Sequence, residues 1–218
     1  GSVNDVPNKD AVILPEAVNG GYIMLHRPCI GRQGDLSISL AMSDSLTGEW
    51  RDLGTVIRPL RHPKYTVSWV GAGSSPIALG DNRFLADYHT GNYYPNGERE
   101  YFVSYAVLNF NNFDPMRPET ALESRCEGVL LPETQYELNS PWPHAKPLNC
   151  VFPCGSYRRN GDIILVYGGA DAYVLAARFD TDELLCQLDE RRCYPLPSSD
   201  DEPDHVSPRL IRQRARSR

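Results

Sequence analysis

A three-part pattern occurs three times along the chain and constrains the fold more than any other sequence feature. Each copy has an apolar run near a proline, a turn rich in Gly, Asp or Asn, and a strand-forming run that carries polar residues. The copies cover residues 11–27, 75–89 and 150–167, with turns at 19–21, 80–82 and 160–162. A recurring unit of several short strands is typical of a β-propeller. We therefore predict an all-β chain of three blades.

The predicted blades are consecutive units of antiparallel strands. The first covers about residues 9–57, the second about 69–122 and the third about 129–188. They form one predicted domain over residues 1–190, with a short helix at 182–191 and a flexible tail at 191–218. Closed propellers have about four to eight blades, so three form a partial propeller. Because unpaired edge strands favour association, we expect a homo-oligomer formed through the open blade edges.

Composition and charge exclude some classes of protein. The 218 residues are 41% hydrophobic and 23% charged, which is ordinary for a globular protein. The net charge is −6 although the last ten residues hold five arginines and no acid, so the remainder is more acidic still. We expect no nucleic-acid partner for this acidic body; a nucleic-acid or partner-binding arm is the alternative interpretation of the basic tail. With no apolar run of about 18 residues and no signal peptide, we expect no membrane partner and a cytoplasmic location.

The cysteines predict neither a disulfide framework nor a metal centre. The six are Cys29, Cys126, Cys150, Cys154, Cys186 and Cys193, and no two form a C-x-x-C pair. Cys150 and Cys154 are separated by three residues, but no second Cys or His pair at zinc-ligand spacing accompanies them. We expect buried free thiols, no metal and no cofactor.

Polar residues near the ends of predicted strands are the candidate site residues, because propeller loops converge on a central cavity. These are Lys9, Asp10, His26, Arg27, Asp87, Tyr88, His89, Tyr101, Glu137 and Asp171. Carboxylates suit sugar hydroxyls and glycosidic acid–base chemistry, whereas Lys, Arg, His and Tyr donors suit a phosphate. Singly, each has a structural explanation: a solvated surface charge, or an Asp that forms a turn. Their recurrence at equivalent repeat positions favours a functional role.

Two further patterns have mainly structural interpretations. Gly71–Ser75 is rich in glycine, but it lacks the Walker pattern and no helix is predicted after it, so we interpret it as tight backbone near the propeller centre. The aromatic residues Trp50, Trp69, Trp142, Tyr93 and Tyr94 could stack on sugar faces, although packing explains them equally well.

Seven segments between Lys9 and Leu188 resemble motifs of glycoside hydrolase family 130, in the same order and at similar spacing. They are Lys9–Glu16 (KDAVILPE), Leu25–Pro28 (LHRP), Gly71–Ile77 (GAGSSPI), Tyr88–Gly91 (YHTG), Leu131–Glu137 (LPETQYE), Asn149–Gly155 (NCVFPCG) and Tyr167–Asp171 (YGGAD). The chain departs from the family pattern in two of them. Serines replace two prolines in the third segment, and one residue is inserted in the fourth. The resemblance implies a five-bladed propeller.

The resemblance also implies a function. Family members are phosphorylases and hydrolases that act mostly on β-mannosides, and the phosphorylases use inverting attack by inorganic phosphate. The matched positions imply phosphate contacts at Lys9, His89 and Tyr101, and sugar contacts at Arg27, Glu137 and Asp171. The Lys, His and Tyr favour a phosphorylase over a hydrolase, and the chain as a whole resembles the β-1,4-mannosyl phosphorylases of the family. The implied partner is a β-mannoside oligosaccharide, with inorganic phosphate as co-substrate.

One part of the family site has no counterpart in these 218 residues. The resemblance places the general acid, an aspartate, and a further phosphate-binding arginine upstream of the segment that Lys9 begins. We therefore expect the chain to match the last three of five blades, and we assign no catalytic residue. Loss of a general acid typically lowers the rate by about 10²–10⁴, so we expect impaired turnover. The alternative is a non-catalytic glycan-binding or oligomeric assembly module.

Overall fold

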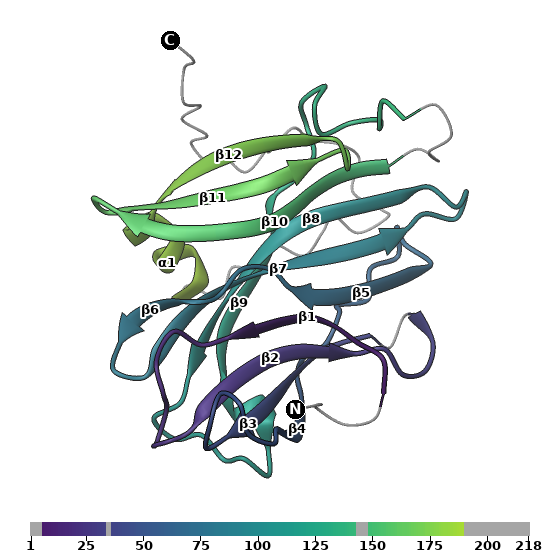
Figure 1. The fold of residues 1–218 in the computed structure, drawn as a ribbon. Coiled ribbons are helices and arrows are strands. Elements are labelled where there is room, and N and C mark those ends of the chain that lie inside the picture. Colours follow the sequence, from purple (N-terminus) through teal and green to yellow (C-terminus); the bar gives the residue numbers. More distant parts are fainter. Residues whose placement is uncertain (1–5, 34–35, 143–147, 190–218) are drawn as a thin grey trace.

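The computed structural model describes residues 6–33, 36–142 and 148–189, and most of them form β-strands (Figure 1). The strands are β1 (Asn8–Ile13), β2 (Tyr22–Pro28), β3 (Ile38–Ser43), β4 (Arg51–Ile57), β5 (Val67–Ala72), β6 (Ile77–Gly80), β7 (Arg83–Tyr93), β8 (Arg99–Asn109), β9 (Leu122–Leu130), β10 (Leu148–Arg159), β11 (Asp162–Gly169) and β12 (Tyr173–Asp180). A 3-10 helix, η2 (Pro118–Ala121), and an α-helix, α1 (Thr181–Asp189), complete the described elements. The predicted β-rich fold is confirmed, whereas the number of blades stays a prediction.

The first four strands form an antiparallel sheet in the order β1-β2-β3-β4. This sheet matches the unit predicted over residues 9–57. Lys9 lies opposite Arg27 in the β1–β2 register, and a bulge follows between Lys9 and Val12. The bulge changes the direction of the side chains next to it. The bulge therefore determines the directions in which the Lys9 and Asp10 side chains point.

The remaining strands form one sheet in the order β12-β11-β10-β8-β7-β5, with β6 beside β7 and β9 beside β8. The predicted boundary between the second and third units, at 122–129, is wrong because β9 runs through it as one strand antiparallel to β8. The third group begins instead at Leu148. A short parallel pairing of Leu148–Cys150 with β8 joins it to the second group, and Figure 1 shows β10 running beside β8.

The predicted turns owe their shape to residues that tolerate positive φ. Four two-residue turns have positive φ at both positions: Asn19–Gly20, Asp81–Asn82, Asn160–Gly161 and Ala170–Asp171. This is the backbone of type I′ hairpin turns, whose twist matches that of the flanking strands. The first three confirm the turn predictions, and the fourth confirms that Asp171 occupies a turn.

Two hydrophobic clusters fill the interior. One includes Leu25, Leu40 and Phe110, and links the first sheet to β7 and β8. The other includes Phe179 and Leu184, and places α1 against β8 and β9. The predicted helix is confirmed as far as Asp189, while the predicted tail at 191–218 lies outside the described residues. In the described part, no helix is long and apolar enough to span a bilayer.

The cysteine prediction is correct in part. Cys29, Cys126, Cys150, Cys154 and Cys186 are free thiols, and Cys193 lies outside the described residues. Cys126 and Cys150 are buried, and burial raises the pKa of Cys150 to about 12. The expectation of burial is wrong for Cys154 and Cys186, which are exposed.

Candidate functional site

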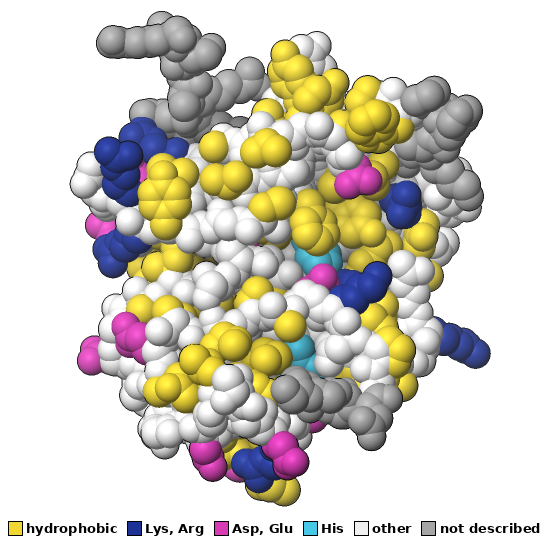
Figure 2. Space-filling view, in the orientation of Figure 1, with side chains coloured by type: hydrophobic (Ala, Val, Ile, Leu, Met, Phe, Trp, Pro, Cys, Tyr) yellow, Lys and Arg dark blue, Asp and Glu magenta, His cyan; other side chains and the backbone are white. Residues whose placement is uncertain are grey.

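A carboxylate, a guanidinium and an imidazole meet where the two sheets face each other. Arg27 Nη1 lies 3.0 Å from Asp10 Oδ2 and 3.1 Å from His89 Nε2, and His89 Nε2 lies 3.7 Å from Asp10 Oδ2. We call these three residues the Asp10–Arg27–His89 cluster. The space-filling view shows a histidine, an acidic and a basic side chain side by side on one face (Figure 2). The cluster therefore joins residues from β1, β2 and β7.

Strand alternation explains why these residues share one place. Side chains two residues apart on a strand face the same side, so Asp87, His89 and Gly91 of β7 share a face. Gly91 lies opposite Tyr101 of β8, which therefore faces the same side. From the other sheet, Asp10 enters with a φ of 53° beside the β1 bulge. That left-handed conformation is uncommon outside glycine, although Asp adopts it more readily than most residues.

Gly71 makes the close approach of the cluster possible. A Cβ atom at this position would lie 2.1 Å from Asp10 Oδ2, 2.5 Å from His89 Cε1 and 2.7 Å from Arg27 Nη1. Gly73 is crowded in the same way, because its Cβ would lie 2.0 Å from Asp87 Oδ1. The interpretation of Gly71–Ser75 as tight backbone is confirmed. Any side chain at Gly71 would displace the cluster.

Burial keeps the His89 imidazole neutral. The residue is 1% exposed, and burial, together with the Arg27 charge, lowers the pKa of its imidazole to about 3. Arg27 can only donate, so His89 Nε2 accepts, and the ring proton of the neutral form resides on Nδ1. Among the described residues, neither His89 Nδ1 nor Arg27 Nε has a hydrogen-bond partner. The cluster therefore holds two unsatisfied N–H donors.

Opposing effects act on the charge of Asp10. Burial raises the pKa of its carboxyl, while the Arg27 and Lys9 charges lower it. Lys9 itself is exposed on β1, opposite Arg27. With Asp10 ionised, two cations surround one anion and a neutral imidazole, so the centre carries a positive charge suited to an anionic ligand.

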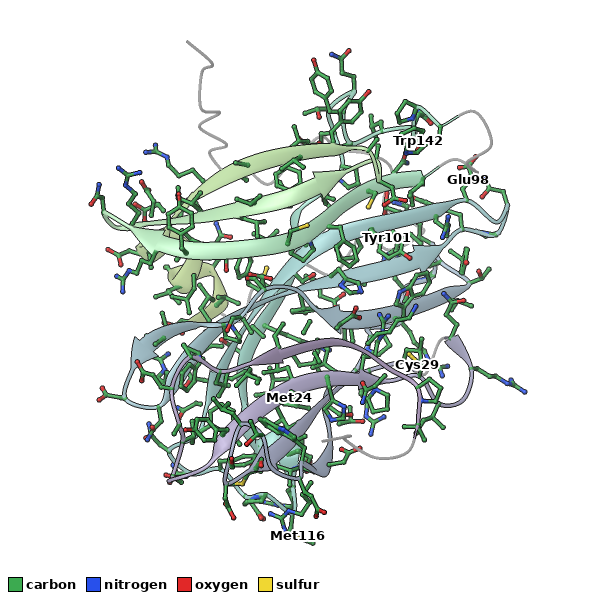
Figure 3. All side chains as sticks on the ribbon, viewed as in Figure 1. Met24, Cys29, Glu98, Tyr101, Met116 and Trp142 are labelled. Carbon is green, nitrogen blue, oxygen red and sulfur yellow. The ribbon has the colours of Figure 1, made fainter. Side chains whose placement is uncertain are left out.

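Aromatic rings form one wall of the centre. The Phe152 ring lies 4.4 Å from the His89 ring, and the Tyr101 ring lies 6.1 Å from each of them. Trp69 packs edge-on against Tyr101 at 5.5 Å. Figure 3 shows Tyr101 beside β7, whose Gly91 lies opposite it in the β7–β8 register. These rings exclude water from the imidazole, which strengthens electrostatic interactions there.

Glu137 and Asp171 belong to a second group of residues around β10. The fully buried Glu137 carboxylate accepts the backbone N–H groups of Glu133 and Thr134 at 2.8 Å each, and the Tyr167 hydroxyl at 2.6 Å. Asp171 is exposed in the β11–β12 turn, where its carbonyl accepts the Trp142 indole N–H at 3.2 Å. Figure 3 shows Trp142 above that end of the sheet.

Strand β10 connects the two groups. The Cys150 N–H donates to the Glu137 carbonyl at 2.8 Å, and the Ala170 N–H donates to the Cys150 carbonyl at 3.0 Å. Cys150 also lies opposite Tyr101 in the β8–β10 register, and Phe152 follows two residues later beside His89. Of the predicted sugar-contacting residues, Arg27 lies in the first group, and Glu137 and Asp171 lie in the second.

The buried Asp87 carboxylate of β7 accepts a hydrogen bond from β10, near the cluster. Asp87 accepts the Ser74 N–H at 2.7 Å, the Ser74 hydroxyl, and the Ser156 hydroxyl at 2.8 Å. Burial raises the pKa of Asp87, and these hydrogen bonds oppose that rise. Asp87 lies two residues before His89, so this network links the part of β7 that carries His89 to β10.

One predicted site residue, His26, has a structural role, and two residues near the cluster were not predicted. His26 is fully buried, and its ring contacts Asn8 Nδ2 at 2.9 Å and Asp52 at 3.6 Å rather than the cluster. The ring of Phe152 and the hydroxyl of Ser156 were not predicted. Their only sequence signal is the matched segment Asn149–Gly155, which contains Phe152 and ends just before Ser156.

Comparison with known proteins places these features in a family. The sequence model of glycoside hydrolase family 130, described as beta-1,4-mannooligosaccharide phosphorylase, matches residues 3–190. A 1,2-beta-oligomannan phosphorylase of Thermoanaerobacter sp. (strain X514) is 33% identical over 174 residues, which are 80% of this chain and 51% of that protein. A beta-1,2-mannobiose phosphorylase of Listeria innocua is 31% identical over 87% of this chain and 48% of that protein.

Solved structures agree with the sequence comparison. The beta-1,2-mannobiose phosphorylase from Listeria innocua, in complex with beta-1,2-mannobiose, superimposes with a TM-score of 0.66 at 30% identity. The match covers 87% of this chain and 49% of that one. The chain thus spans about half the length of the relatives it matches.

Proposed function

The chain belongs to glycoside hydrolase family 130, and we propose that it carries the phosphate-binding part and part of the sugar-binding part of a β-mannoside phosphorylase site. In this proposal Lys9, His89 and Tyr101 contact phosphate, whereas Arg27, Glu137 and Asp171 contact the sugar. Relatives named for both β-1,2 and β-1,4 activities support mannoside phosphorolysis as the reaction class.

The main support is the convergence of Asp10, Arg27 and His89 over Gly71. Together with Lys9, these residues bring a net positive charge and two unsatisfied N–H donors to one centre. Such an arrangement is costly to leave without a ligand, because buried donors that lack partners destabilise a protein. An oxyanion supplies acceptors for these donors and the negative charge that the centre lacks.

The chain's own residues can organise one half of the proposed reaction. A phosphate oxygen attacks the anomeric carbon, and the glycosidic oxygen leaves with a proton from a general acid. Lys9 would neutralise part of the phosphate charge and orient the dianion, with the Tyr101 hydroxyl as a further hydrogen-bond partner. Neutral His89 would donate a hydrogen bond from Nδ1 without adding a charge, while the Phe152 ring shields the imidazole from water. Because the resemblance assigns the acid to a segment without a counterpart in these residues, we expect slow turnover by this polypeptide.

A phosphorolysis assay tests the proposal. The 218-residue protein is incubated with phosphate and either β-1,2- or β-1,4-mannobiose, and mannose 1-phosphate is measured. We expect weak release that K9A and H89A abolish, with thermal unfolding confirming that both variants fold. Release that is unchanged in both variants would contradict the assigned phosphate contacts. Rapid release by the unmodified protein would contradict only the expected impairment.

A second candidate function is glycan binding without turnover. The observation that favours it is the half-exposed group at the β11–β12 turn, where Asp171 and Trp142 are both accessible. Aromatic rings and carboxylates are typical sugar contacts. Calorimetry with manno-oligosaccharides in phosphate-free buffer tests this function. Absence of binding by folded protein at millimolar sugar would count against it.

A further inference from the structure

A cavity of about 620 Å³ opens between the β2–β3 and β4–β5 connections. The β4–β5 connection contributes Arg58, Arg61 and His62 to its lining, and the β2–β3 connection contributes Arg32. No residue of the Asp10–Arg27–His89 cluster is among the lining residues that the structure describes. The cavity therefore needs an explanation of its own.

The described lining of the cavity is basic, although the chain as a whole is acidic. It includes three arginines and a histidine but no Asp or Glu, while the chain has a net charge of −6. Within the described ranges, Arg32, Arg58 and Arg61 form no ion pair with an acidic side chain. Three guanidinium groups around one cavity attract an anion and can bind it through paired hydrogen bonds.

An acidic side chain beside the lining residue Tyr65 is already engaged. Glu100 accepts hydrogen bonds from the hydroxyls of Tyr65 and Tyr94, the latter at 2.8 Å, and lies 3.8 Å from Lys64 Nζ. Glu100 thus balances Lys64, which follows the arginines in the same connection. It leaves the charge of Arg58 and Arg61 available to a ligand.

Strand β9 holds one wall of the cavity in place. Arg125 Nη1 donates to the Arg58 carbonyl at 2.7 Å, and the Leu60 backbone donates to Glu127. Both contacts fix the backbone on either side of Pro59. Because this segment is ordered before any ligand arrives, binding costs less conformational entropy.

The size and the remaining lining indicate the class of ligand. A cavity of about 620 Å³ is much larger than inorganic phosphate requires and falls within the range of small-molecule sites. The hydroxyls of Thr66 and Ser68 donate to the Tyr93 carbonyl and to Asn92 Oδ1, so their oxygens can still accept hydrogen bonds from sugar hydroxyls. The Tyr65 ring and Leu60 suit the C–H face of a sugar. We infer that this cavity binds a hexose phosphate, with its phosphate group on the arginines. The choice of mannose 1-phosphate as the probe rests on the proposed function.

Amide NMR of the ¹⁵N-labelled protein can locate binding. We expect mannose 1-phosphate to shift the amides of Thr66, Val67 and Ser68, which border the cavity. R58A/R61A should weaken this response about tenfold or more, because each lost charge-assisted hydrogen bond is worth that much in affinity. R158A/R159A is the matched control, since it removes two exposed arginines at the β10–β11 turn and should bind as the unmodified protein does.

The H89A variant separates this inference from the proposed function. Shifts at 66–68 that persist in H89A support the cavity, even if phosphorolysis is never observed. If R58A/R61A folds and binds as tightly as the unmodified protein, or if millimolar mannose 1-phosphate shifts no amide at 66–68, the inference is wrong. Equal affinity for inorganic phosphate would contradict the hexose part, and equal affinity for mannuronate would contradict the preference for a phosphate ester.

Discussion

Gly71 is the residue on which the geometry of the candidate site depends most directly. In G71A the new methyl group would overlap Asp10, Arg27 and His89, so we expect unfolding to become easier by about 1–3 kcal/mol and the phosphate response at His89 to be lost. G155A is the control, because its Cβ would meet nothing within 4 Å. Urea unfolding and phosphate titration of both variants test this. Unchanged phosphate binding in G71A would show that the cluster tolerates displacement.

Glu127 should make stability depend on pH. Burial raises the pKa of this carboxyl to about 6 from an ordinary 4.5. The folded protein therefore holds this proton more tightly than the unfolded chain, and the Glu127 contribution to stability decreases as pH rises from about 4.5 to 6. In E127Q this loss should disappear, which makes the variant more stable at pH 7 by about 2 kcal/mol.

Urea unfolding across pH 4–7.5 measures the effect of E127Q. The exposed Glu119 provides the control variant, E119Q, which should keep the pH profile of the unmodified protein. Equal pH profiles for E127Q and the unmodified protein would contradict the burial of an ionised Glu127.

At the scale of elements, the contact between β10 and β7 depends on hydroxyl groups that donate hydrogen bonds to the Asp87 carboxylate. S156A removes one hydrogen bond to this buried carboxylate, and we expect it to destabilise the protein by about 1–3 kcal/mol. The control is S124A, because the Ser124 hydroxyl is buried without a hydrogen-bond partner among the described residues and its removal should be neutral or slightly stabilising. Chemical unfolding compares the two variants. Equal stabilities would indicate that packing alone holds β10.

The limits of sequence-based prediction are clearest at β9. Gly128 looks like a turn between two strands, yet it has a φ of 70° inside β9, where the register shifts against β8. Local sequence does not separate a glycine in a bulge from a glycine in a turn, because both need positive φ. By contrast, Asn160–Gly161 is an Asn-Gly pair followed by the apolar run Ile163–Tyr167, and its turn was predicted correctly.

For the site, too, some residues could be predicted from the sequence and others could not. Family resemblance selected Arg27 and His89, which the structure brings into contact. The roles of Gly71, Phe152 and Ser156 depend on contacts between β5, β7 and β10, which are far apart in the sequence, and no local pattern encodes those contacts. The assigned phosphate and sugar contacts themselves stay predictions.

At the scale of the whole molecule, exposed strand edges still predict self-association. β12 ends the order of the larger sheet, and its Val174 is 83% exposed. We expect a concentration-dependent oligomer that V174K weakens, because a charge on an edge strand opposes pairing with a second chain. M116K is the control, since Met116 is equally exposed but lies outside the strands. Light scattering that finds a monomer at every concentration would contradict the prediction.

The contacts that build the site also determine when it can appear during folding. Arg27 and His89 are 62 positions apart in the chain, and Asp87 and Ser156 are 69 apart. Closing such long loops is slower than forming hairpins, because more chain entropy is lost before the contact is made. The turns at Asn19–Gly20 and Asn160–Gly161 can therefore form early, while the imidazole reaches Arg27 and Phe152 late. A refolding chain will show most of its β-structure before the Asp10–Arg27–His89 cluster forms.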